Sequence, residues 1–210
     1  TRYRSSAASD VYKRQALEPL RLANGPIIKS VTNLDGPPGI ESQQDADSAA
    51  LQVINIIKRN NSADAFVIAC FSDPGIYAAR EVTNKPVFGI AESGILTALS
   101  LGSSFGILAI LDTSVPRHVR YVRSLGLEKR LAGDLAIGLG VAELSDEKKT
   151  FHRLLEVGRK LRDNHEASVL ILGCAGMARY RHNLQESLGI PVVDPSQAAV
   201  SMAVSAVLLN

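Results

Sequence analysis

The sequence contains two cysteines, Cys70 and Cys174, and each follows a short apolar run typical of a buried parallel strand. Turn-forming residues come next in both cases, FSDPG at 71–75 and AGMA at 175–178. Ligands bind at the carboxyl ends of strands in open α/β sheets, so both thiols can reach a cleft. The N-terminus of a following helix favours the thiolate, which can act as a base.

Two thiols on opposite sides of one cleft could invert a stereocentre. One sulfur would remove a proton from one face of a substrate carbon, and the other would return a proton to the opposite face. The carbon must lie next to a carbonyl group, which activates it. We therefore predict Cys70 and Cys174 as the catalytic acid and base. A lone cysteine at a strand end is more often a small core residue, so this prediction depends on the matching positions of the two.

The segments around the two cysteines match in order and character. In each, a strand ending in Cys is followed by a Pro-Val strand and a helix. Cys70 lies sixteen residues before Pro86, and Cys174 lies seventeen residues before Pro191. This agreement indicates a duplicated unit. The matching pairs are residues 64–75 with 168–178 and residues 85–102 with 190–207.

Short β-branched runs alternate with longer amphipathic stretches from Gly25 onward, which predicts an α/β protein with parallel sheets. We expect two pseudo-symmetric βα halves with the active site in the cleft between them. The expected domains are a non-native or disordered leader at 1–15, a first half at 16–102 and a second half at 103–210, with the C-terminal helix able to cross to the first. The expected strands are 27–32, 65–70, 86–90, 105–110, 135–140, 168–173 and 191–194, and the expected helices are 42–60, 92–101, 115–125, 146–164 and 196–208.

The first half lacks a counterpart to one strand of the second. The second half opens with the apolar run FGILAILDTSV at 105–115, before its strand at 135–140. Nothing comparable precedes the strand expected at 27–32. We therefore expect the first half to be truncated at its N-terminus, without its first strand and the helix after it.

Groups near the cysteines and at other strand ends are candidates for holding the substrate. Backbone amides in the turns, together with hydroxyls such as Ser196, could stabilise an enolate. Asp73 fits an ordinary Ser-Asp-Pro-Gly turn in which the carboxylate bonds its own backbone. The scattered histidines, His118 among them, are expected on the surface. The predicted substrate-binding residues are Phe71, Ser72, Ser93, Thr113, Ala175, Gly176 and Met177.

Composition excludes several classes of partner. The 210 residues carry a formal net charge of +2, so no strong field favours nucleic acid or membranes, and a small-molecule substrate is expected. Two cysteines make neither a disulfide scaffold nor a closed zinc site, and reduced thiols favour the cytoplasm. No motif for a pyridoxal, nicotinamide or flavin cofactor occurs. We expect an enzyme that uses neither metal nor cofactor.

Three segments carry a family resemblance: ACFSDPG, the run PVFGIAESGILTALSLGSSFGILAILDTSVP, and LILGCAGMA. They resemble the aspartate/glutamate/hydantoin racemase superfamily over roughly residues 25–210, and the two cysteine motifs resemble its hydantoin and allantoin racemase branch. The resemblance implies a two-base mechanism without metal or cofactor, with Cys70 and Cys174 as the acid/base pair, and frequent oligomerisation. Family members carry an Asn-Pro-Asn loop after their first strand, and no such segment occurs in this sequence.

Three functions follow as hypotheses. The first is racemisation of a carbon beside a ring carbonyl, with a 5-substituted hydantoin or allantoin as substrate. The second keeps the superfamily but takes aspartate or glutamate as substrate, or isomerises a dicarboxylate. Neither cysteine turn contains Arg or Lys within it, which favours the neutral ring. The third is a truncated, non-catalytic homologue that binds a ligand without turnover.

Overall fold

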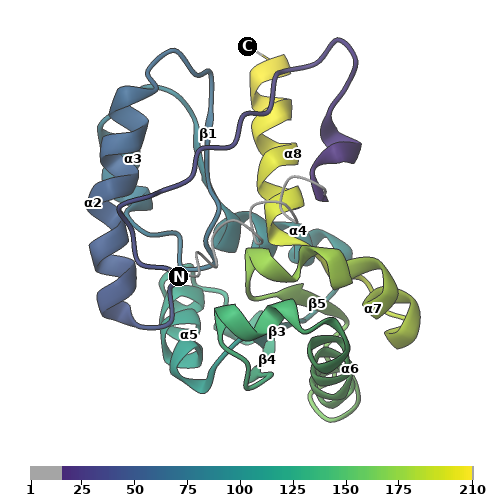
Figure 1. Ribbon diagram of the computed structural model, residues 1–210. Helices are drawn as coiled ribbons and strands as arrows, with labels where there is room; N and C mark the ends of the chain where they lie inside the picture. The colour runs from purple at the N-terminus through teal and green to yellow at the C-terminus, as the bar shows by residue number, and fades with distance from the viewer. Residues whose placement is uncertain (1–15, 210) are drawn as a thin grey trace.

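The computed structural model describes residues 16–209, so the expected leader at 1–15 lies outside the described residues. Strands and helices alternate along the described chain (Figure 1). The strands are β1 (Phe66–Ile68), β2 (Val87–Gly89), β3 (Phe105–Ala109), β4 (Leu131–Ala136), β5 (Val169–Leu172) and β6 (Val192–Val193). The α-helices are α2 (Gln43–Arg59), α3 (Ile76–Glu81), α4 (Ile90–Leu101), α5 (Val115–Ser124), α6 (Glu147–Asp163), α7 (Arg181–Leu188) and α8 (Pro195–Leu208). Short 3₁₀ helices are η1 (Glu18–Leu20), η2 (Asp112–Ser114), η3 (Glu128–Arg130), η4 (Val141–Ser145) and η5 (Ala175–Tyr180).

The strands form two parallel sheets of different size. The small sheet pairs β1 with β2, and the large sheet has the order β4-β3-β5-β6. Every pairing is parallel, which requires the helical crossovers that the chain supplies. The predicted α/β class with parallel sheets is confirmed. The pseudo-symmetry of two halves stays a prediction.

The large sheet is covered on both faces. Alternate residues of its central strands face opposite sides, so Ile107 and Ile171 pack with α4 and α8, whereas Leu108 and Leu170 pack with α6 and α7. A third apolar cluster, which includes Ile57, Ile76 and Val87, joins α2 and α3 to the small sheet. Figure 1 shows these two helices on the same side of β1. Helix α8 also contacts β1 and β2. The C-terminal helix therefore packs against strands of both sheets.

Local sequence fixes several helix ends. Ser42 and Asp45 form a reciprocal capping box at the start of α2, in which the Ser42 hydroxyl accepts from the Asp45 amide at 3.1 Å. Asp146 caps α6 by accepting from the amide of Lys149 at 3.1 Å. These side-chain caps explain why α2 and α6 begin within one residue of their predicted starts.

The strand expected at residues 27–32 does not form. These residues have no regular secondary structure, and Ile27 is 93% exposed. They belong to the long connection between η1 and α2 (Figure 1), and they line a large cavity together with residues of β1. These residues therefore border a cavity instead of forming hydrogen bonds with a neighbouring strand. Apolar residues that have no partner strand do not form a strand themselves.

The strand expected at 135–140 is placed too late in the chain. Strand β4 ends at Ala136, because Ile137, Gly138 and Leu139 turn back to donate amide hydrogen bonds to Ala109 and Ile110 of the β3 end. Gly138 has φ = 72°, which an extended strand cannot accommodate. Helices α3 and α7 were not expected from the sequence; their short lengths of 6 and 8 residues give little periodicity to detect.

Candidate active site

A cavity of about 1360 Å³ opens between the two sheets. Cys70 reaches it from the end of β1, and Cys174 reaches it from the end of β5. The segments that follow β3 and β4 contribute Ser114 and Leu144, and the start of α8 contributes Ser196. Both cysteines are thiols and both are half-buried. The structure thus brings the two sulfur-bearing residues to one cavity at the carboxyl ends of strands.

Cys174 immediately precedes the short helix η5, and its sulfur accepts a hydrogen bond from that helix. The amide of Gly176 donates to the Cys174 sulfur, with N and Sγ 3.4 Å apart. An N–H group directed at sulfur stabilises a negative charge there, as amides at helix N-termini do. The local backbone therefore suits a thiolate at position 174.

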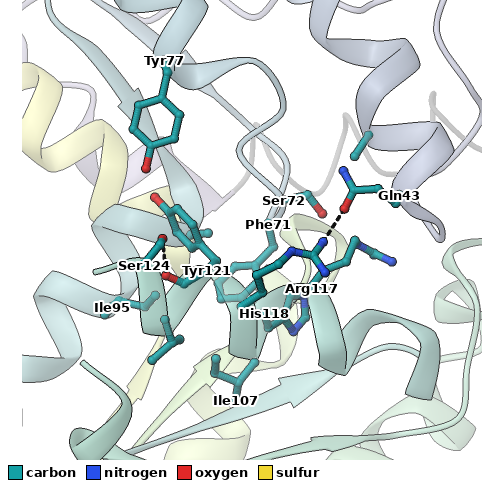
Figure 2. A pocket seen from close by; sticks show the side chains of 14 residues that line it. Gln43, Phe71, Ser72, Tyr77, Ile95, Ile107, Arg117, His118, Tyr121 and Ser124 are labelled. Carbon is teal, nitrogen blue, oxygen red and sulfur yellow. Dashed lines mark hydrogen bonds between the residues drawn. The ribbon is translucent and has the colours of Figure 1, made fainter. Parts of the chain in front are cut away.

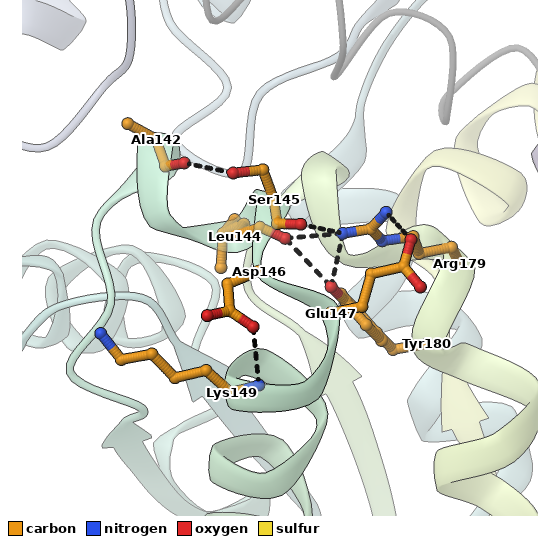
Figure 3. Close-up of polar contacts among 8 residues, drawn as sticks. All are labelled: Ala142, Leu144, Ser145, Asp146, Glu147, Lys149, Arg179 and Tyr180. Atoms are coloured by element: carbon orange, nitrogen blue, oxygen red, sulfur yellow. Dashed lines mark hydrogen bonds and ion pairs between the residues drawn. The ribbon is translucent and has the colours of Figure 1, made fainter.

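The turn after Cys174 is tied to the segment after β4 (Figure 3). Arg179 donates to the backbone oxygen of Leu144 at 2.8 Å and pairs with Glu147 at 2.8 Å. The Tyr180 hydroxyl also donates to Leu144 O, at 3.0 Å, and Arg179 lies over the Tyr180 ring. Leu144 lines the cavity, so this network fixes two of its walls to each other.

Arg117 approaches Cys70 from helix α5, and the sequence gave it no role. It lines the cavity, donates to the backbone oxygens of Thr113 at 3.0 Å and Glu41 at 3.2 Å, and interacts electrostatically with Cys70. Burial lowers the pKa of Arg117, and a negative charge on Cys70 opposes that effect. A guanidinium there would favour a thiolate at Cys70. The available sequence signal for Arg117 was its position in the first turn of the helix that follows an apolar strand.

His118 is a correction to the sequence interpretation, which placed the histidines on the surface. It is 5% exposed, and its Nδ1 lies 2.9 Å from Asp134 Oδ2 of strand β4. Burial raises the pKa of Asp134, while the contact with His118 opposes the rise. His118 also packs edge-to-face on Phe71, with ring centroids 5.1 Å apart. His118 therefore packs against Phe71, the residue that follows Cys70.

A second, smaller pocket of about 280 Å³ lies next to Phe71 and His118 (Figure 2). It shares Phe71, Ser72, Arg117 and His118 with the large cavity. Its rim is braced by a hydrogen bond of 2.6 Å from Arg120 to the side chain of Gln43. Phe71 and Ser72 of the Cys70 turn thus line both hollows, while Phe71 itself is buried in an apolar cluster.

The structure divides the predicted substrate-binding residues into two groups. Phe71, Ser72, Ala175 and Gly176 line the cavity beside the cysteines. Three others lie elsewhere. Met177 is fully buried in the core of the large sheet, Ser93 is 1% exposed inside α4, and the Thr113 hydroxyl donates to Glu41 O on an exposed loop. In these three cases the residue is near a strand end in sequence but is not among the residues that line the cavity.

Ser196 lies at the cavity with its hydroxyl buried and without a hydrogen-bond partner among the described residues. Its amide donates to Asp194 at 2.8 Å, so the start of α8 is capped by the preceding residue. Burial raises the pKa of Asp194 to about 6. The Ser196 hydroxyl therefore has unused hydrogen-bonding capacity next to the cavity.

Neither a metal cluster nor a membrane span is found in the described part of the chain. Residues 16–209 contain no group of three or more His, Cys, Asp or Glu side chains placed to hold a metal ion. Within the same residues, no helix has the length and apolar character needed to cross a bilayer.

Comparison with known proteins identifies the family. Residues 8–203 match the model of the Asp/Glu/Hydantoin racemase family. The chain belongs to this family. It is 37% identical over 179 residues to the hydantoin racemase of Pseudomonas sp. (strain NS671), an alignment that covers 84% of this chain and 72% of the relative. It is 36% identical over 194 residues to the hydantoin racemase of Paenarthrobacter aurescens, with 90% and 82% covered.

A solved structure agrees with these relatives. The allantoin racemase from Klebsiella pneumoniae superimposes with a TM-score of 0.87 at 32% identity, covering 97% of this chain and 84% of that one. The predicted family resemblance is confirmed, and with it the assignment of this chain as an isomerase of the racemase type.

Proposed function

We propose that this racemase inverts the ring carbon of a 5-substituted hydantoin or of allantoin, with Cys70 and Cys174 as acid and base. The single observation that supports the proposal most is the convergence of both cysteines on one cavity from two different sheets. The names of the related hydantoin racemases and of the superimposed allantoin racemase supply the substrate class.

The chemistry needs two proton transfers and no other reagent. One cysteine thiolate takes the proton from the carbon beside the ring carbonyl, and the electron pair moves onto the carbonyl oxygen. The second cysteine, as a thiol, gives its proton to the opposite face of that carbon, and the carbonyl reforms. The thiol and the thiolate have exchanged places at the end, so the reverse reaction starts from the other cysteine.

Several groups at the cavity would assist these steps. The Gly176 amide and the Arg117 guanidinium would favour the thiolate form of Cys174 and Cys70, respectively. The buried Ser196 hydroxyl would donate to an oxygen of the ring or of the enolate. Because these donors are fixed before the substrate binds, they need little reorganisation during the reaction. The reduced thiols that the mechanism requires favour a cytoplasmic enzyme, and assembly as a homo-oligomer stays a prediction.

One observation favours a second substrate class. Arg117 lines the cavity near Cys70, and a guanidinium can hold a carboxylate through two hydrogen bonds. An acidic amino acid such as aspartate or glutamate would use that interaction, whereas a neutral ring would not need it.

Polarimetry separates these possibilities. The purified chain is incubated separately with one enantiomer of a 5-substituted hydantoin, allantoin, aspartate and glutamate, and optical rotation is followed beside an enzyme-free control. We expect racemisation of a hydantoin or of allantoin and no change with the amino acids. Racemisation of the amino acids alone would overturn the substrate class, and binding of a hydantoin without turnover would indicate a non-catalytic homologue.

A further inference from the structure

The turn that carries Cys70 is held by an aspartate that takes no part in the proposed proton transfers. Asp73 is 3% exposed, and its two carboxylate oxygens accept from the amides of Ala91 and Glu92, each at 2.9 Å. These amides belong to the first turn of α4, eighteen and nineteen residues further along the chain. The sequence interpretation of a carboxylate bonded within its own turn is therefore wrong, because both oxygens are bonded to another segment. Asp73 caps a helix from another segment.

The corresponding helix of the large sheet is capped in the ordinary way. There β6 leads into α8, and Asp194 immediately before the helix accepts from Ser196 N. In the small sheet β2 leads into α4, and the residue immediately before the helix is Gly89, which has no side chain to act as a cap. The cap carboxylate comes instead from the Cys70 turn.

The Asp73 side chain leaves no room for a side chain at position 89. A Cβ atom on Gly89 would lie 2.2 Å from the Asp73 carboxyl group, well inside contact distance. Asp73 itself has φ = 41° and precedes Pro74, a combination that is unfavourable for a residue with a side chain. The two amide hydrogen bonds offset this backbone strain. The arrangement is thus specific to a carboxylate on the turn and a glycine before the helix.

The carboxylate sits in a confined polar environment. Tyr121 of α5 approaches it with its hydroxyl 3.5 Å away, and Glu92 of α4 pairs with Arg80 of α3 close by. Burial raises the pKa of Asp73 to about 7, while the two amides oppose the rise. A buried carboxylate is costly unless it is well bonded. An Asp at position 89 could cap α4 equally well, so capping alone does not explain a buried carboxylate at position 73.

We propose that Asp73 is a positioning residue that fixes Cys70 in the cavity by tying the Cys70 turn to the start of α4. The backbone connects the two directly, since the Asp73 amide donates to the Cys70 oxygen at 3.0 Å. The small sheet ends at Ile68, two residues before the sulfur, and the turn has a hollow on either side. The proposal rests on the proposed function only for its effect on turnover.

Moving the cap from the turn to the helix tests the proposal. Asp73→Gly removes the cap, and the double variant Asp73→Gly with Gly89→Asp rebuilds it in the place that Asp194 occupies before α8. We expect Asp73→Gly to lower both the melting temperature and kcat. The double variant should regain most of the melting temperature but stay at least about tenfold below the wild type in kcat, since misplacement by about 1 Å can cost about a hundredfold.

A measurement without substrate separates this proposal from the proposed function. The rates at which iodoacetamide alkylates Cys70 and Cys174 are followed by mass spectrometry in one sample, so Cys174 serves as the internal reference. We expect Cys70 to react several times faster in both the single and the double variant, with Cys174 unchanged. Asp146→Ala, which removes the cap of α6, is the matched control and should leave both rates and kcat unchanged.

The outcomes are distinct. Wild-type kcat and wild-type Cys70 alkylation in the double variant would mean that Asp73 is only a helix cap, and the proposal would be wrong. Unchanged alkylation in Asp73→Gly would overturn it as well. Should Asp73→Gly fail to fold, Asp73→Asn keeps the shape of the side chain but turns one acceptor into a donor, and the same two readouts apply. Absence of turnover in the wild type with altered Cys70 alkylation in the variants would refute the proposed function alone.

Discussion

The two sheets support their cysteines in different ways. Cys174 follows β5, whose residues are all buried between strands β3 and β6. Cys70 follows β1, a strand of three residues that is half-buried over most of its length and pairs, among the described residues, with β2 alone. The sheet itself therefore positions Cys174. The position of Cys70 depends on contacts between its own turn and neighbouring helices, chiefly those of Asp73 with α4 and those of Arg117 and His118 from α5.

This difference teaches that two residues proposed for the same chemistry can be held by sheets of different size and burial. The proposed proton transfer from both faces would require both sulfurs to be equally well placed, although the strands that precede them are not equally buried. Polar contacts of the turn can compensate for a weak sheet, because they fix the same backbone from outside it. Each prediction below compares a residue in or next to the small sheet with one in or next to the large sheet.

The largest effect is expected from the sulfur atoms. Cys70→Ser and Cys174→Ser should each lower kcat for racemisation by about 10²–10⁴-fold, because a hydroxyl is far too weak an acid to serve as the same base near neutral pH. Polarimetry with a 5-substituted hydantoin measures the loss, and circular dichroism checks that the fold is kept. If both single variants retained full turnover, the cysteines would not be the acid and base.

A smaller effect separates the two sheets in stability. Val169→Ala in β5 removes two fully buried methyl groups and should lower the free energy of unfolding by about 2 kcal/mol. Val67→Ala in β1 makes the same change at a half-buried position and should cost less than half as much. Urea unfolding of the two variants beside the wild type measures both. Equal losses would show that the small sheet is as well packed as the large one.

Strands β3, β5 and β6 of the large sheet, and the placing of both cysteines at strand ends, could be predicted from the sequence, because short apolar runs bounded by turns indicate buried strands. Strand β4 was placed too late, because its sequence is not continuously apolar. The strand expected at 27–32 is wrong, because this run is apolar enough for a strand but pairs with no strand among the described residues. Asp73 was missed as a cap for α4 because its amide partners lie eighteen and nineteen residues away. Arg117 and His118 were missed because a helix wheel alone does not show which face meets a cavity.

The remaining prediction concerns pH and compares Asp73 with Asp194. Burial raises the pKa of these carboxyls to about 7 and about 6, from 3.8. The folded state thus binds each proton more tightly than the unfolded state does, so the free energy of unfolding falls as the pH rises from about 4 through those values. Each group contributes a slope of at most about 1.4 kcal/mol per pH unit.

Asparagine variants make the comparison measurable. The difference in unfolding free energy between the wild type and Asp73→Asn should keep changing up to about pH 7, whereas the difference for Asp194→Asn should level off near pH 6. Urea unfolding at half-unit steps of pH follows both. A difference between the wild type and Asp73→Asn that stays constant from pH 4 to pH 8 would mean that Asp73 does not titrate differently in the folded protein.

Solvent deuterium exchange tests the two-cysteine proposal most directly. Each single Cys→Ser variant is incubated in D₂O with one enantiomer at a time of a 5-substituted hydantoin, and loss of the ring C–H signal is followed by NMR against the spontaneous rate. The remaining cysteine faces one side of the carbon only. Cys70→Ser should therefore catalyse exchange of one enantiomer, and Cys174→Ser should catalyse exchange of the other. Exchange of the same enantiomer by both variants, or of both enantiomers by each, would contradict a mechanism with one cysteine on each face.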